Sequence, residues 1–367
     1  MSRAFRIVTG FVLFSALGLA AAVAAWAFSV ATDEDVIFFR SIAQVETGSQ
    51  AWTPRIHGWV FEPEADSVVR RLLLKAFAKA LGLPAGSEDQ AIFNARASQF
   101  LVDSQRWKDV QVRVGQTTQT LPKTGANGHF EGPIQVPAGA SQGPLPAWLR
   151  YAAVLPAGDP RRFEGAIQLV PPDGVGVISD IDDTIKITQV QDTMEMLRNT
   201  FLRPFRPVEG MPQAYNRWAD AGAVFVYLSA SPWQLYPPLA AFLDEQGFPR
   251  GAVQLKLFRP KDESFVNLAK SPEAYKIPAI EAVLARLPKR SFVLVGDSGE
   301  KDPEIYAEIA RRHPGRVRQI FIRRVGGQGD DQARYDAAFK GVPGERWALF
   351  TDPAVLQQYN VLDRRAR

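Results

Sequence analysis

The chain has 367 residues, contains no cysteine and carries a formal net charge of +4, from 43 Lys and Arg against 39 Asp and Glu. This length allows two or three domains, and an apolar content of 46% is sufficient for complete hydrophobic cores. The mild charge, without a long basic block or a stacking-aromatic motif, argues against a nucleic-acid partner. Three dispersed histidines and the lack of cysteine argue against a zinc site.

The first 31 residues form a separate apolar unit. Arg3 and Arg6 precede an uncharged stretch over 7–31, and acidic residues follow it at once. The stretch is longer than the roughly 7 to 15 residues of a signal-peptide core and reaches the roughly 20 that span a bilayer. We expect an N-terminal apolar helix that acts as an uncleaved signal anchor. A signal peptide cleaved after Ala27 or Ala31 is the alternative.

The charges beside this apolar unit predict its orientation in a membrane. Arg3 and Arg6 favour a cytoplasmic N-terminus, which places the rest of the chain outside the cytoplasm, on the periplasmic side in a bacterium. Fractionation and protease accessibility in intact spheroplasts test this membrane contact. Recovery of the protein only in the soluble cytosol would refute both the tether and the export.

Residues 36–172 have the pattern of a β-rich, sandwich-like domain. Short apolar or alternating runs predict strands over 56–61, 110–114, 151–155 and 163–170. A turn followed by a strand over 127–132 is typical of a hairpin. The segment 70–83 differs, because its apolar spacing suits an amphipathic helix. No catalytic constellation is present here, so a binding or scaffolding role is expected.

Residues 173–367 have the pattern of an α/β domain in which three apolar runs end in polar side chains. The runs over 175–180, 222–229 and 291–297 end in Asp180, Ser229 and Asp297. Continuous apolar strands are typical of a parallel sheet covered by helices on both faces. Such sheets bind ligands at the carboxyl ends of their strands. We therefore expect these side chains to meet at one edge of a doubly wound sheet, to which 253–258 adds a strand.

Carboxylates crowd the end of the first of these strands. Asp180, Asp182 and Asp183 follow one another closely, and Asp302 comes shortly after Asp297. Buried carboxylates repel one another unless a cation offsets their charge, and a hard divalent ion with oxygen ligands suits them. A solvated acidic turn is the simpler alternative, and Asp183 in particular has the character of a turn residue.

Three strings in this half carry a resemblance to a known family. They read Ser-Asp-Ile-Asp-Asp-Thr-Ile-Lys at 179–186, Ser-Ala-Ser-Pro-Trp-Gln-Leu at 229–235 and Gly-Asp-Ser-Gly-Glu-Lys-Asp-Pro-Glu-Ile-Tyr at 296–306. Their order, with Lys276 at the head of a predicted helix over 277–287, resembles the haloacid dehalogenase superfamily of phosphotransferases. The strings are similar, more narrowly, to the catalytic domain of the actin-patch-associated phosphatidate phosphatase family and its bacterial members. The resemblance covers 173–352.

The resemblance implies a Mg²⁺-dependent hydrolase of a phosphomonoester that forms an aspartyl-phosphate intermediate. It makes Asp180 the nucleophile and Asp182 the general acid and base. Thr184 and Ser229 would bind the phosphoryl group, and Lys276 would supply positive charge to it. The implied metal ligands are Asp180, Asp182, Asp297 and Asp302. From the residues alone, Ser231 competes with Ser229 for the phosphate contact, and Lys270 competes with Lys276.

The substrate that the resemblance implies is phosphatidate, which would be cleaved to diacylglycerol. The gaps between the motifs leave room for a minimal cap only, so we expect an open site that suits a bulky lipid. Trp233 and Tyr236 follow the second motif and suit a lipid interface, with packing in the core as the alternative.

Three other functions are weighed against this one. Hydrolysis of a soluble phosphomonoester stays open, as does a membrane-anchored scaffold that contains a vestigial phosphatase domain. The string Gly-Asp-Ser-Gly at 296–299 also fits a serine protease, but none of the three histidines lies in a recognisable catalytic string. A protease is therefore disfavoured.

Overall fold

The computed structural model describes residues 29–44, 51–63, 67–84, 86–87, 89–137, 145–257, 272–327 and 330–361. The apolar unit at 1–31 lies almost entirely outside these ranges, so its role as an anchor or a signal peptide stays a prediction. Within the described ranges, no helix combines the length and the apolar character needed to cross a membrane.

The C-terminal half is built on a six-stranded parallel sheet, as its continuous apolar runs predict. Its strands are β12 (Val175–Asp180), β13 (Val224–Pro232), β14 (Ala252–Lys256), β15 (Ser291–Asp297), β16 (Val317–Arg323) and β17 (Trp347–Phe350). Their order across the sheet is β14-β13-β12-β15-β16-β17, so the direction of the chain's progress reverses between β12 and β15. Open α/β sheets bind ligands outside the carboxyl ends of the strands at such a reversal.

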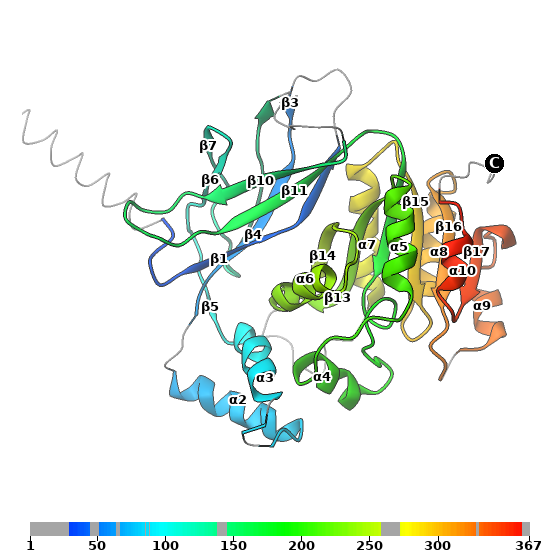
Figure 1. Ribbon diagram of the computed structural model, residues 1–367, viewed down its shortest axis with the longest axis horizontal. Coiled ribbons are helices and arrows are strands. Elements are labelled where there is room, and N and C mark those ends of the chain that lie inside the picture. Colours follow the sequence, from blue (N-terminus) through cyan, green and yellow to red (C-terminus); the bar gives the residue numbers. More distant parts are fainter. Residues whose placement is uncertain are drawn as a thin grey trace, which may run out of the picture.

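Helices cover both faces of this sheet (Figure 1). One face packs against α5 (Met211–Asp220), α6 (Tyr236–Glu245) and α10 (Ala354–Gln358). The other face packs against α7 (Pro272–Arg286), α8 (Asp302–Arg312) and α9 (Gln332–Ala338). Adjacent strand residues point to opposite faces, so Val177 lies in the first core and Ile178 in the second. The predicted doubly wound α/β architecture is therefore confirmed.

The β-rich part consists of two sheets around a shared apolar core. The four-stranded sheet contains β1 (Asp35–Phe39), β4 (Arg55–Glu62), β5 (Asp103–Ser104) and β8 (His129–Pro133). The five-stranded sheet contains β2 (Ser41–Gln44), β11 (Glu164–Val170), β10 (Ala147–Ala153), β6 (Gln111–Val114) and β7 (Thr117–Thr120). A separate pair joins β3 (Ala51–Trp52) to β9 (Val136–Pro137). Val60 and Phe130 from the first sheet share one buried cluster with Ile167 and Leu169 from the second.

Two predictions in the β-rich part need correction. The turn at 125–128 does not close a local hairpin, because the strand that follows it, β8, pairs antiparallel with the distant β4. The predicted amphipathic helix is α2 (Val68–Ala80), which begins earlier than expected because the Ser67 hydroxyl caps it by accepting a hydrogen bond from the Arg70 N–H. A second helix, α3 (Asp89–Ala97), was not predicted, since it buries few apolar side chains.

Helix α7 also begins earlier than its apolar pattern predicts. Its first residue is Pro272 rather than Ile277, which places Lys276 in the second turn. Proline is favoured at the first helical position because its fixed φ suits the helix and its missing N–H would have no partner there.

Arg40 marks the junction between the two parts of the chain. It separates β1 from β2, and its carbonyl accepts a hydrogen bond of 3.1 Å from the N–H of Val253 in β14. Its guanidinium group pairs with Asp244 of α6. One buried apolar cluster contains side chains from both parts, among them Phe39 and Trp233, whose rings lie 4.0 Å apart between centroids.

Two histidines of the β-rich part lie at this junction. Their facing ring nitrogens, His57 Nε2 and His129 Nδ1, are 3.1 Å apart. Burial lowers the pKa of each to about 3, and the positive charge of Arg286 adds to the effect on His57. Both rings are therefore neutral near pH 7, and one donates its ring proton to the other.

The histidine pair predicts a pH-dependent stability. Below the ordinary pKa of 6.5, the two histidines bind protons in the unfolded chain but stay neutral in the folded chain. The free energy of unfolding therefore decreases as the pH falls from 6.5 toward 3. Each histidine contributes at most about 1.4 kcal/mol per pH unit in this window. His57→Gln should make the decrease shallower in urea denaturation measured between those pH values. Equal slopes for the wild type and the variant would contradict the assignment.

Candidate active site

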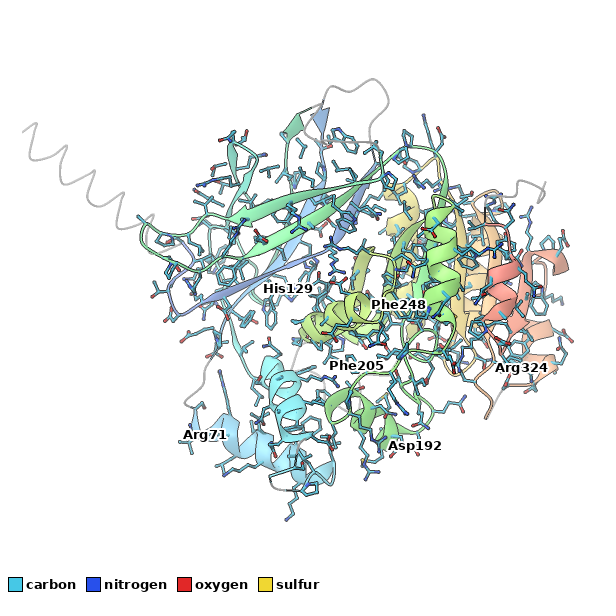
Figure 2. All side chains as sticks on the ribbon, viewed as in Figure 1. Arg71, His129, Asp192, Phe205, Phe248 and Arg324 are labelled. Atoms are coloured by element: carbon cyan, nitrogen blue, oxygen red, sulfur yellow. The ribbon has the colours of Figure 1, made fainter. Side chains whose placement is uncertain are left out.

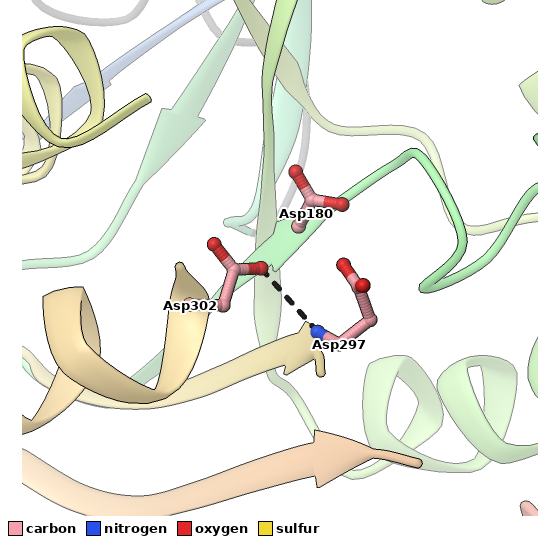
Figure 3. Close-up of side chains that lie close together, drawn as sticks. All are labelled: Asp180, Asp297 and Asp302. Carbon is pink, nitrogen blue, oxygen red and sulfur yellow. Dashed lines mark hydrogen bonds between the residues drawn. The ribbon is translucent and has the colours of Figure 1, made fainter. Parts of the chain in front are cut away.

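Three buried carboxylates meet at the reversal point of the parallel sheet. Asp180 ends β12, Asp297 ends β15 and Asp302 begins α8. Figure 3 shows them turned toward one another, and one oxygen from each lies within 4.8 Å of the others. Oδ2 of Asp302 accepts a hydrogen bond of 3.3 Å from the Asp297 N–H, which links two of the three acids. The structure therefore brings together three of the four predicted metal ligands.

Lys276 of α7 points into the same cluster. Its Nζ lies 2.8 Å from Asp180 Oδ1, 2.9 Å from Glu300 Oε2 and 2.6 Å from Asp302 Oδ1. Burial alone would lower the pKa of Lys276, but attraction to these three acids raises it well above its usual range. The geometry thus favours Lys276 as the cation of the site, while its competitor Lys270 lies outside the described residues.

The cluster holds more negative charge than one lysine balances. Burial raises the pKa of Asp180, Asp297 and Glu300, with Lys276 opposing the effect. Oδ2 of Asp180 is buried and has no hydrogen-bond partner among the described residues. A buried, unpaired carboxylate oxygen is unfavourable unless a cation or a donor satisfies it. An all-oxygen donor set of this kind fits Mg²⁺, which prefers carboxylate ligands.

The carboxylate of Asp182 has other partners. Its Oδ1 lies 2.8 Å from Lys186 Nζ and accepts a hydrogen bond from Thr188 Oγ1. Its Oδ2 accepts hydrogen bonds from the hydroxyls of Ser229 and Ser231, at 2.7 and 2.9 Å. Burial would raise the pKa of Asp182, but Lys186 and these donors hold it well below its usual range.

Asp182 is therefore the one predicted metal ligand whose side chain the structure does not bring into the carboxylate cluster. Strand β12 ends at Asp180, so the alternation that would aim residues two apart in the same direction stops there. The following turn instead brings Lys186 back to Asp182, because the Ile181 carbonyl accepts hydrogen bonds from the N–H groups of Ile185 and Lys186.

The remaining predicted side chains lie around this cluster. Thr184 is buried and donates to Asp297 Oδ2 at 3.4 Å. Ser229 is fully buried and also accepts a hydrogen bond from the Ser231 N–H at 2.9 Å, so both serines surround Asp182. Asp183 is a turn residue, since its carboxylate accepts hydrogen bonds from the three successive N–H groups of residues 188–190.

Besides Thr188, three side chains with contacts in this site had no predicted role. Lys186 and Glu300 lie inside the sequence strings that carry the family resemblance. Their charge, close in sequence to the acids of the site, could have indicated a role there. Arg334 of α9 braces the loop after β15, because it donates to the carbonyls of Ser298 and Glu300 at 2.6 and 2.5 Å. Nothing in the sequence near the motifs points to Arg334, which contacts them only through the fold.

The expected lipid-facing role of Trp233 and Tyr236 is wrong. Their side chains are only 2% and 7% exposed. Trp233 packs against Phe39 and, edge to face at 4.7 Å, against His57. The Tyr236 hydroxyl accepts a hydrogen bond of 3.0 Å from the Arg40 N–H. The β-rich part covers this loop, so the core-packing alternative holds.

The expectation of an open site is also wrong for this conformation. Asp180 is 1% exposed, and Asp297 and Asp302 are fully buried. A cavity of only about 40 Å³ lies next to Asp182, and its lining includes Ser231 and Glu300. The lining also includes the apolar side chains of Met196 and Leu197 of α4 (Thr193–Phe201). The segment after the first motif therefore forms a small cover, although no large cap is present in the described residues.

The buried position of Trp233 predicts a large loss of stability on truncation. Trp233→Ala should lower the free energy of unfolding by about 3–5 kcal/mol, because it leaves a cavity at the junction. Trp107, which is exposed, offers a matched control, and Trp107→Ala should stay within about 0.5 kcal/mol of the wild type. Chemical denaturation measures both, and similar losses for the two variants would contradict the packing argument.

Comparisons with known proteins agree with the position of these motifs. Residues 175–324 match the family model described as "Phosphatidate phosphatase APP1, catalytic domain". Phosphatidate phosphatase APP1 of Saccharomyces cerevisiae is 37% identical over 171 residues, which cover 46% of this chain and 29% of that protein. An uncharacterized protein of Schizosaccharomyces pombe is 31% identical over 169 residues, which cover 45% of this chain and 27% of that protein. The chain thus spans less than a third of the length of these curated relatives.

Similarity to solved structures adds little. The D,D-heptose 1,7-bisphosphate phosphatase from B. bronchiseptica, in complex with magnesium and phosphate, is 15% identical and covers 50% of this chain and 97% of its own, at a TM-score of 0.25. A likeness of this size carries no argument about fold or function. The sequence matches are more informative, because they include all three strand ends that form the buried acidic site. Residues 175–324 are therefore similar to the catalytic-domain family of phosphatidate phosphatase APP1.

Proposed function

We propose that the protein is a Mg²⁺-dependent phosphomonoester hydrolase in which Asp180 is the nucleophile. The observation that carries this proposal is the environment of Asp180. Its carboxylate lies at the reversal point of the sheet, 2.8 Å from Lys276, with one oxygen that no hydrogen bond satisfies among the described residues. A carboxylate held without donors on its second oxygen is suited to attack phosphorus, because no hydrogen bond has to be broken first.

The cation that this chemistry needs fits the residues present. Asp180, Asp297 and Asp302 would hold a magnesium ion, which when bound supplies charge that offsets the repulsion between a phosphate dianion and the acids around it. Lys276 contributes positive charge at the same point and favours the ionised form of Asp180, against the effect of burial on its pKa. Thr184 donates to Asp297 and so orients one of the three acids.

The proposed reaction has two steps, and Asp182 transfers a proton in each of them. Asp180 attacks phosphorus and the bond to the leaving oxygen breaks, while Asp182 gives that oxygen a proton. A water molecule then attacks the aspartyl-phosphate and gives its proton to Asp182, which frees phosphate and restores Asp180. In this conformation Lys186 and two serine hydroxyls stabilise the ionised form of Asp182, which suits the second step. Ser229 and Ser231 would turn to the phosphoryl oxygens once substrate displaces these bonds.

For the substrate we propose phosphatidate, with diacylglycerol and phosphate as products. The support is the similarity to the family of phosphatidate phosphatase APP1 over 175–324. Hydrolysis of a soluble phosphomonoester is the second candidate, and the small cavity of about 40 Å³ beside Asp182 favours it. A vestigial phosphatase domain is disfavoured, because burying four carboxyl groups around Lys276 is costly and a protein without activity has no physical reason to keep them.

Replacement of Asp180 tests the proposed nucleophile. Asp180→Asn is nearly isosteric but removes the attacking oxygen, so the rate of phosphate release should fall by at least about 10³. Asp220, an exposed aspartate at the end of α5, offers a control, and Asp220→Asn should keep wild-type activity. Near-normal turnover by Asp180→Asn would refute the proposed mechanism.

Phosphate release from a panel of lipid and soluble phosphomonoesters tests metal and substrate together. We expect turnover with Mg²⁺ or Mn²⁺, none in excess chelator, and little with Ca²⁺, whose looser coordination shell misplaces the reacting groups. Phosphatidate should be the preferred member of the panel. Full activity in chelator would refute the metal site, whereas a preference for a soluble phosphate would refute only the substrate.

A further inference from the structure

Helix α2 presents four aliphatic side chains to solvent. Val68, Val69, Leu72 and Leu73 are between 53% and 66% exposed. They recur at positions i, i+1, i+4 and i+5 of the helix, so they lie on one face, which we call the apolar stripe. Exposed aliphatic residues that cluster in this way mark an interaction surface, whereas isolated ones need no explanation.

Positive charge accompanies the apolar stripe. Arg71, Lys75 and Lys79 are exposed on the same helix, and α2 contains no acidic residue. Arg71 extends outward from the helix at the edge of the molecule (Figure 2). An exposed apolar stripe flanked only by basic side chains is the composition of a helix that lies in the surface of an anionic bilayer.

The opposite face of α2 is fixed to the body of the protein. The ring of Phe77 packs at 5.6 Å on Phe93 of α3 and at 5.1 Å, edge to face, on Phe201 of α4. Arg198 of α4 donates a hydrogen bond of 3.2 Å to the Leu81 carbonyl at the end of α2. The helix therefore has its own packed face, and the apolar stripe is a second face that nothing in the described residues covers.

The helix that supports α2 also borders the proposed active site. Met196 and Leu197 of α4 line the small cavity beside Asp182. Met194 on the same helix is also an exposed apolar residue, at 41%. Figure 1 shows α2, α3 and α4 together at one end of the molecule. A membrane that contacts α2 would therefore face the side on which α4 covers the site.

We propose that the apolar stripe of α2 is the surface by which this protein docks on an anionic lipid bilayer. Charge complementarity selects this occupant, since Arg71, Lys75 and Lys79 on the helix would repel the same side chains on the helix of a second copy. Docking itself depends only on α2, whereas its use in presenting a lipid phosphate to Asp180 rests on the proposed function.

A single fluorescent label on the full chain tests the docking surface directly. The chain contains no cysteine, so Leu72→Cys accepts one environment-sensitive fluorophore at a known place. We expect blue-shifted, brighter emission when vesicles of equal parts phosphatidylglycerol and phosphatidylcholine are added, and little change with phosphatidylcholine alone. Ala333→Cys, at an exposed position on α9, is the control and should not respond. Because the label reports its own surroundings, any membrane contact elsewhere in the chain does not mimic the signal.

Charge variants on the labelled protein test the electrostatic part. Lys75→Gln with Lys79→Gln should raise the concentration of anionic lipid needed for half of the shift by roughly 25-fold, at about fivefold for each charge removed. Lys340→Gln, at an exposed position after α9, is the matched control and should change nothing. High salt should act in the same direction as the double variant.

Three results would overturn the proposal. They are no shift on anionic vesicles, an equal shift on purely zwitterionic vesicles, and a shift that grows with protein concentration when no vesicles are present, which would indicate contact between copies. For the link to catalysis, Leu72→Asp with Leu73→Asp should lower hydrolysis of phosphatidate in anionic vesicles at least about tenfold and leave a small soluble phosphomonoester unaffected. If the wild type hydrolysed neither ester, the proposed function would fail, while the fluorescence result would still decide the docking surface.

Discussion

The arrangement of the C-terminal half depends on one buried contact, that of Lys276 with the acids at the reversal point of the sheet. Moving several carboxylates out of water costs several kcal/mol for each ion unless opposite charge and hydrogen bonds offset it. Lys276 supplies that charge within 3 Å of Asp180, Glu300 and Asp302 at once. It can do so only because β12, β15 and α7 converge at the same edge, so the order of the strands and the charge balance of the site support each other.

Much of this half could be predicted from the sequence, because its signals are local. A strand buried on both faces is apolar whatever its neighbours are. The apolar runs that end in Asp180, Ser229 and Asp297 can therefore be recognised as buried strands from the sequence alone. The partners of Asp182 were not predictable in this way. They depend on a turn whose hydrogen bonds bring Lys186 back to the end of β12. The alternation of side chains along a strand does not predict side-chain directions in the turn that follows it.

The environment of the loop after β13 was also beyond local inference. Nothing near Trp233 in the sequence indicates that Phe39 and His57, which lie far earlier in the chain, pack on it. An aromatic pair on a Pro-rich loop is equally compatible with a lipid interface and with a core, and only the tertiary contact separates the two. Because Ser231 lies at the end of β13, two residues before Trp233, the β-rich part braces a side chain of the site without contributing a reacting group.

A buried site conflicts with the proposed lipid substrate, and helix α4 is the element that contacts both the cavity of the site and the proposed docking helix. Because Asp180 is buried, a phosphate group reaches it only after a movement of the chain nearby, and Met196 and Leu197 are among the residues that line the cavity next to Asp182. A bilayer bound at α2 favours such a movement only if it binds the open arrangement more tightly than the closed one. The contact of Phe77 with Phe201 supplies a physical route for that difference, since α2 cannot shift into a membrane without changing its packing on α4. Part of the free energy of binding between the apolar stripe and the bilayer could thus stabilise the open arrangement of the site.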